Sequence, residues 1–122
     1  MHRDLPEEVA EAVRIWRGTE TFCEAPSSLA PTAAMAACER LADKPQAHEL
    51  AVFSLLDDDC ALVVAYALHT LRLMRSAHLA SLPPTLLERH DRIKERIGSF
   101  RFASALGDYA RKLRTLAPHD EF

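Results

Sequence analysis

The chain has few of the residues on which sheet proteins and phosphate-binding loops depend. Its 122 residues include only five valines, three isoleucines and three glycines, and no asparagine. Strand formers and turn glycines are therefore too scarce for a sheet protein, whereas the abundant alanine and leucine favour helices. Neither a P-loop nor a dinucleotide-binding glycine pattern is present. The composition predicts an all-α protein with no cofactor.

Cysteine and long apolar runs are scarce as well. Cys23, Cys38 and Cys60 are odd in number and lack CxxC spacing, which argues against a disulfide framework and a structural zinc site. The longest uninterrupted apolar run, Cys60 to Leu68, is far shorter than a membrane span, and the acidic N-terminus lacks the apolar core of a signal peptide. These absences predict a cytoplasmic protein. The arginine-rich basic set would suit a GC-rich bacterial genome.

The remaining composition is that of one globular domain, expected to span residues 1–122. Hydrophobic residues make up 48% of the chain and charged residues 27%, which is too apolar for a disordered tail. Residues 1–71 hold 5 basic and 12 acidic side chains, whereas residues 72–117 hold 10 basic and 4 acidic ones. An acidic end and a basic end could steer partners or permit salt-sensitive self-association. The alternative is a mosaic surface that only keeps the protein solvated.

Capping residues, apolar periodicity and proline or glycine stops divide the chain into six predicted helices. They are expected over residues 4–18, 32–43, 45–56, 59–75, 85–97 and 101–116. The fourth is apolar around most of its circumference and should therefore be central. Residues 19–31, with two prolines and no periodicity, are expected to form a loop that Phe22 and Leu29 attach to the core.

Residues 46–75 resemble the HEAT repeat, a helix pair that stacks into α-solenoids. The residues that carry the resemblance are the acidic turn Asp57 to Asp59, Val63, Ala65, Ala67 and Leu71. Val64 and Tyr66 depart from the family pattern. Six helices would form three antiparallel pairs, each close to the repeat length of roughly 40 residues. The resemblance implies a HEAT-like right-handed superhelix, with a compact irregular helical bundle as the alternative.

The resemblance also implies protein binding, through a groove lined by the second helix of each pair. The polar positions that would line or border this groove are His69, Arg72, Asp108, Arg111 and Lys112, followed by the acidic turn Asp57, Asp58 and Asp59. His69 has a second interpretation, as a neutral side chain at the edge of the core. The aspartates have one too, because they can form the turn and cap the fourth helix; the stretch lacks the glycine and the terminal glutamate of an EF-hand.

A basic stripe is expected on the fifth predicted helix, where Arg89, Arg92 and Arg96 recur at i, i+3 and i+7. Such a stripe could contact phosphates or an acidic protein. Interleaved acidic residues, a pI near 6.0 and the lack of a DNA-binding signature disfavour nucleic acid. A solvated helix face is the plain alternative.

Catalytic signatures are absent from the sequence. No HExxH pair or GxSxG elbow occurs, and no acid–base pair stands at catalytic spacing. The predicted function is therefore a non-catalytic protein–protein interaction module, such as a small adaptor, a regulator or an immunity-type protein. Binding of a nucleic-acid backbone through the basic C-terminal half is the first alternative, and an enzyme of another class is the second. No metal site and no membrane partner are predicted.

Overall fold

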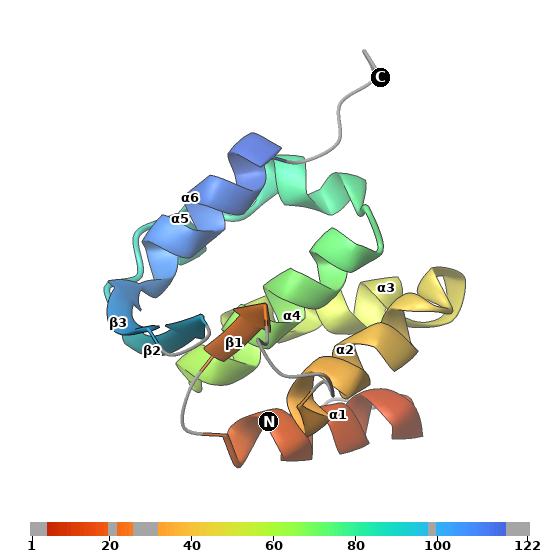
Figure 1. The fold of residues 1–122 in the computed structure, drawn as a ribbon. Helices are drawn as coiled ribbons and strands as arrows, with labels where there is room; N and C mark the ends of the chain where they lie inside the picture. The colour runs from red at the N-terminus through yellow and green to blue at the C-terminus, as the bar shows by residue number, and fades with distance from the viewer. Residues whose placement is uncertain (1–4, 20–21, 26–31, 98–99, 117–122) are drawn as a thin grey trace.

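A computed structural model describes residues 5–19, 22–25, 32–97 and 100–116 (Figure 1). In chain order the elements are α1 (Glu7–Arg17), β1 (Phe22–Ala25), α2 (Ala33–Ala42), α3 (Pro45–Phe53), the 3-10 helix η1 (Ser54–Asp57), α4 (Ala61–Leu73), the 3-10 helix η2 (Ala77–Ser81), α5 (Pro84–Leu87), β2 (Arg92–Ile97), β3 (Phe100–Ala105) and α6 (Leu106–Leu116). The described chain is mainly α-helical, and the prediction of about six helices is confirmed.

The first four helices lie close to their predicted bounds because local signals fix their ends. α2 starts after Thr32, whose hydroxyl accepts a hydrogen bond from the Met35 amide at 3.1 Å. Pro45 occupies the first turn of α3, where its missing amide hydrogen costs nothing. α4 begins after the acidic turn, where the Asp58 carboxylate accepts from the Cys60 amide at 2.8 Å. The predicted role of an aspartate in forming this turn is thus confirmed at Asp58.

α4 is the central helix, as its apolar sequence predicts. Every residue from Val63 to Leu71 is buried, and α1, α2, α3, β1 and α6 all pack against the helix (Figure 1). Full burial of one valine or leucine side chain contributes about 1.5–3 kcal/mol. α4 therefore contributes more buried apolar residues than any other single element of the described fold.

Four aromatic side chains connect α1, β1 and α6 through α4. Tyr66 of α4 stacks on Trp16 of α1 with ring centroids 6.0 Å apart, and Phe22 of β1 lies edge-on to Tyr66 at 4.8 Å. Phe22 also lies edge-on to Tyr109 of α6 at 5.0 Å. The prediction that Phe22 attaches its segment to the core is confirmed, since this side chain is fully buried. Its predicted companion, Leu29, lies outside the described residues.

A three-stranded sheet occupies two parts of the chain that were expected to be helix or loop. β2 is its middle strand, parallel to β1 and antiparallel to β3. The predicted helix over 85–97 is therefore wrong beyond the short α5, and the helix expected from residue 101 begins only at Leu106. β1 likewise lies within the stretch expected to be a loop. In place of a third pair of long helices, the chain has α5, the β2–β3 hairpin and α6.

The spacing of two isoleucines explains the wrong helix. Ile93 and Ile97 are four residues apart, a separation that satisfies both the helical period of about 3.6 and the strand period of 2. Pairing with β3 decides between the two, because β-branched side chains suit a pleated strand. Ile93 is buried in this arrangement. One short hairpin needs few strand formers, so the low valine and isoleucine content does not prevent it.

Candidate functional site

The C-terminal ends of α4 and α6 lie on the same side of the molecule. α6 packs against α4, α5 and η2, and α4 and α6 run in roughly the same direction (Figure 1). Phe22 lies between the two helices, edge-on to His69 of α4 at a centroid distance of 6.2 Å and edge-on to Tyr109 of α6. About one helical turn further along come Arg72 on α4 and Lys112 on α6. The fold thus brings together the two helices on which partner-binding residues were predicted.

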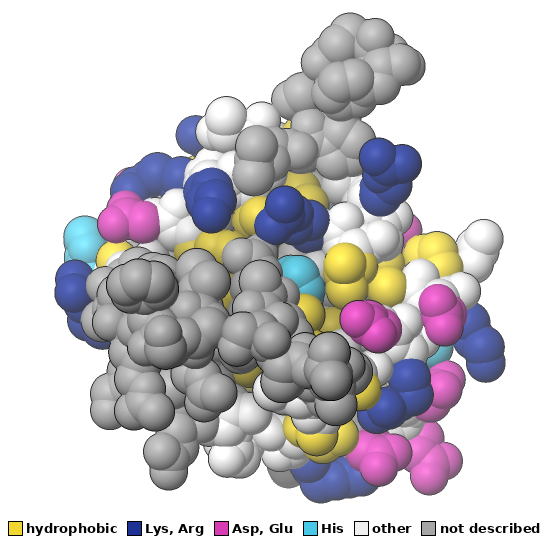
Figure 2. All heavy atoms as spheres, in the orientation of Figure 1, with side chains coloured by type: hydrophobic (Ala, Val, Ile, Leu, Met, Phe, Trp, Pro, Cys, Tyr) yellow, Lys and Arg dark blue, Asp and Glu magenta, His cyan; other side chains and the backbone are white. Residues whose placement is uncertain are grey.

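Exposed basic side chains cover these helix ends and form what we call the basic face. Its members are Arg72 and Arg75 at the end of α4, and Arg111, Lys112 and Arg114 on α6. Figure 2 shows Lys and Arg side chains gathered over α6 and the end of α4, next to hydrophobic surface. Arg111 pairs with Asp108 at 2.9 Å, so Asp108 serves its own helix. Within the described part of the chain, Arg75, Lys112 and Arg114 form no ion pair.

His69 lies beneath the basic face. Its side chain is only 5% exposed, and its ring contacts that of Phe22. Of the two interpretations that the sequence left open, burial at the edge of the core fits this position. His69 therefore supports the surrounding surface by packing, while the exposed Arg72, one turn on, is the α4 side chain that can reach a ligand.

The chain leaves α4 through Arg75, which has a left-handed backbone with a φ of 58°. The Ser76 amide donates to the Leu71 carbonyl oxygen and the Arg75 amide to that of Arg72, each at 3.0 Å, which is the Schellman arrangement of a helix end. Glycine is usual at this position, because a Cβ atom disfavours the left-handed region by about 1–2 kcal/mol. Arg75 thus presents a charged side chain from a strained backbone.

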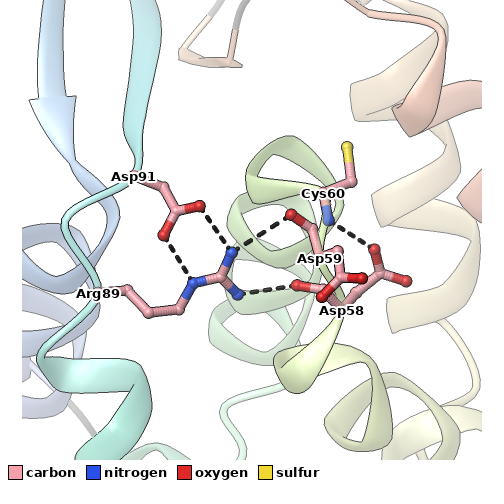
Figure 3. Close-up of polar contacts among 5 residues, drawn as sticks. All are labelled: Asp58, Asp59, Cys60, Arg89 and Asp91. Carbon is pink, nitrogen blue, oxygen red and sulfur yellow. Dashed lines mark hydrogen bonds and ion pairs between the residues drawn. The ribbon is translucent and has the colours of Figure 1, made fainter.

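The acidic turn is held by two arginines from distant parts of the chain. Arg17 of α1 pairs with the Asp58 carboxylate at 2.7 Å. Arg89, which follows α5, donates to the main-chain carbonyl oxygens of Asp58 at 2.8 Å and of Asp59 at 3.4 Å (Figure 3). The turn therefore joins α1 and the segment before β2 to the start of α4. These contacts give Asp58 and Asp59 a structural role that requires no binding partner.

Arg89 also forms a bidentate ion pair with Asp91 (Figure 3). Nε and Nη2 donate to the two carboxylate oxygens at 2.8 and 2.9 Å. These hydrogen bonds lower the pKa of Asp91 and raise that of Arg89, since both favour the charged forms. Arg89 therefore has a structural role, since its guanidinium group is occupied by these contacts.

The predicted basic stripe of Arg89, Arg92 and Arg96 does not exist, because these residues do not share a helix. Arg89 lies in the turn after α5, and Arg92 and Arg96 belong to β2. The spacing i, i+3, i+7 aligns side chains only at a helical period. The stripe fails for the same reason as the helix that was expected to carry it.

A polar cluster between α3 and η2 was not predicted. Ser76 donates through Oγ to the Glu49 carboxylate at 2.5 Å and accepts from the His78 amide at 3.1 Å. The His78 ring lies against Phe53 with centroids 4.7 Å apart. Because the Ser76 hydroxyl is buried and donates to a carboxylate, it links α3 to η2 and lacks the histidine base that activates a serine nucleophile. Ser76 and Glu49 are 27 residues apart, so no local motif could reveal their contact.

The described residues also contain a buried thiol, but no cluster of metal ligands. No three His, Cys, Asp or Glu side chains gather there as a metal ion would require. Cys38 is buried and donates to the Tyr66 carbonyl oxygen, and its burial raises the pKa of the thiol to about 12. Among the described helices, none combines the length and hydropathy needed to cross a bilayer.

In comparisons with protein-family models, curated proteins and solved structures, no match to the chain is found. The HEAT resemblance over residues 46–75 therefore stays a prediction. The basic face at the ends of α4 and α6 is the feature from which a function can be argued.

Proposed function

We propose that the chain is a non-catalytic protein-binding module that takes its partner on the basic face. The observation that carries the proposal is the exposure of Arg75, Lys112 and Arg114, which form no ion pair within the described residues. An uncompensated group of cations attracts an acidic surface and raises the rate at which it associates. The net positive charge of residues 72–117 adds to this field at low ionic strength, where screening is weak.

The packing of the first four helices supports a HEAT-like stack as part of the proposal. α1 packs against α2 and α3 against α4, and the second members, α2 and α4, also touch each other. α4 would then be the inner helix of its pair, the position that lines the groove in the family that residues 46–75 resemble. α6 would extend this inner surface, although the β2–β3 hairpin stands where its partner helix was expected.

Two triple charge reversals with the same change in net charge test the proposal. The test variant carries Arg75→Glu, Lys112→Glu and Arg114→Glu, and the control variant carries Arg14→Glu, Arg40→Glu and Lys44→Glu, three exposed cations away from the basic face. Each is used with the wild type to capture proteins from nuclease-treated lysate of the native cells. We expect one stoichiometric protein with the wild type and the control, and its loss with the test variant.

Circular dichroism and thermal unfolding of the three proteins separate binding from stability. Cations near a helix C-terminus can stabilise the helix through its dipole, typically by about 0.3–1 kcal/mol each. If that were their only role, the test variant would unfold at a lower temperature yet capture the same protein. Capture that occurs only from a parallel lysate without nuclease treatment would assign nucleic-acid binding instead. Capture unaffected by the reversals would overturn the proposal.

A further inference from the structure

Leu73 is an exposed apolar side chain within the basic face. Among the described residues, the exposed large hydrophobic side chains are Leu50, at 72%, and Leu73, at 40%. Leu73 is the last residue of α4 and stands between Arg72 and Arg75. Leu50 belongs to α3, which contributes nothing to the basic face.

The position of Leu73 on α4 directs it toward the flank that α6 borders. Leu73 follows His69 by four residues, so the two side chains share one side of the helix. His69 contacts Phe22, and Phe22 contacts Tyr109 of α6. Leu73 therefore lies about one turn beyond the Phe22 contact on α4, as the exposed Lys112 lies about one turn beyond it on α6.

Two features of this helix end work against stability. Leu73 keeps a leucine side chain partly in water, and Arg75 holds a left-handed backbone at which glycine would be unstrained. A single exposed leucine is ordinary on a protein surface. A leucine and a strained arginine in the same turn, both directed outward, are what a surface selected for binding would present, because strain and local rule-breaking concentrate at functional sites.

We infer that the basic face recognises an acidic peptide segment that carries one large apolar side chain, which packs on Leu73. The inference rests on the proposed protein-binding function and names the chemistry of the partner. The apolar contact excludes water and supplies affinity, while carboxylates on either side of it pair with Arg75 and Lys112. A nucleic-acid backbone would satisfy the cations but offers no comparable side chain to Leu73.

Two short fluorescein-labelled peptides test this partner. Both consist of glutamate and aspartate around one central residue, which is phenylalanine in the first and alanine in the second. By fluorescence anisotropy at low salt, we expect the wild type to bind the phenylalanine peptide about five- to tenfold more tightly than the alanine peptide, as a partly buried leucine contact would give. Leu73→Ala should remove this difference and leave the affinity for the alanine peptide unchanged. Leu50→Ala, the matched control, should behave as the wild type.

Three other results would contradict the inference, and each would identify which part of it is wrong. Equal affinity of the wild type for the two peptides would exclude the Leu73 contact, while lysate capture decides the protein-binding function separately. Binding of neither peptide would exclude an acidic segment as the partner, even if a protein is captured. Binding to phosphatidylserine vesicles that depends on Leu73, with no binding of the peptides, would replace the peptide by an anionic membrane surface.

Discussion

Arg89 donates a hydrogen bond from Nη1 to the main-chain carbonyl oxygen of Asp58 at 2.8 Å, across 31 residues of sequence. The same guanidinium donates two bonds to Asp91, so one side chain joins the acidic turn to the segment before β2. Lysine would keep the charge but has no planar fork with which to make these bonds together. We expect Arg89→Lys to lower the free energy of unfolding by about 1–2 kcal/mol in urea denaturation.

Arg40→Lys is the control for this change. Arg40 is exposed on α2, so its replacement should alter stability by less than about 0.5 kcal/mol. Equal effects of the two substitutions would mean that the contacts of Arg89 contribute nothing beyond its charge.

Gly107 is expected to resist a substitution that helix propensity favours. Its amide donates to the Arg89 carbonyl oxygen at 2.9 Å, and a Cβ atom added there would stand 2.4 Å from the Leu87 carbonyl oxygen. Alanine gains up to about 1 kcal/mol over glycine in a helix, but this clash is with backbone that cannot rotate away. We expect Gly107→Ala to lower stability by roughly 1–3 kcal/mol, measured by thermal and urea unfolding.

Gly18→Ala provides the matched comparison. A Cβ atom at Gly18 would stand 3.6 Å from the Ile15 carbonyl oxygen, an ordinary contact distance, and the φ of −83° suits alanine. This change should be neutral or slightly stabilising. If both alanine variants were equally stable, the close approach of α6 to the turn after α5 would not be rigid.

The buried thiol of Cys38 should make the protein less stable at alkaline pH. Burial raises its pKa from an ordinary 9.0 to about 12, so the folded state keeps a proton that the unfolded state releases. The unfolded chain then binds fewer protons, and the free energy of unfolding falls as pH rises from about 9 toward 12. In urea titrations over this pH range, we expect the free energy of unfolding to decline less steeply for Cys38→Ala than for Cys60→Ala. The same slope in both variants would contradict the assignment.

Arg75→Gly is predicted to stabilise the fold and weaken binding. Glycine removes the strain of the left-handed backbone, for a gain of about 1 kcal/mol in thermal unfolding. The same change removes a cation from the basic face, so the affinity for the acidic peptides should fall and become less sensitive to salt. Arg14→Gly, on the exposed side of α1, should instead destabilise the protein by about 1 kcal/mol and leave binding unchanged. Unchanged stability and binding for Arg75→Gly would remove Arg75 from both roles.

The helical part of the fold is predictable because its signals are local. Thr32 as a cap, Pro45 in a first turn and the apolar run of α4 each act within a few residues, and each is found in its expected place. The sheet is not predictable in this way, since Ile93 and Ile97 fit either period until their strand pairs with β3.

The candidate site is likewise predictable where local signals fix it and not where contacts between distant residues do. The sequence places Arg72, Arg111 and Lys112 on helices, and the structure packs these two helices, α4 and α6, against each other. Arg75 could not be singled out, because the left-handed conformation is usually marked by glycine and nothing in an arginine signals it. The link from Arg89 to the acidic turn was also missed, since Asp58 and Asp59 lie about thirty residues away from it in the sequence.

The parallel pairing of β1 with β2 has a consequence for folding during synthesis. Phe22 stands opposite Glu95, so this first strand must wait for about 70 further residues before its partner leaves the ribosome. Closing so long a loop costs entropy that no local contact returns in advance. α1 to α4 can pack during synthesis, but Tyr109 of α6 reaches the Phe22 ring only after residues 23–108 have been synthesised. A nascent chain stalled before α6 would thus expose the apolar flank of α4 to chaperones and proteases, because α6 is the helix that covers this flank.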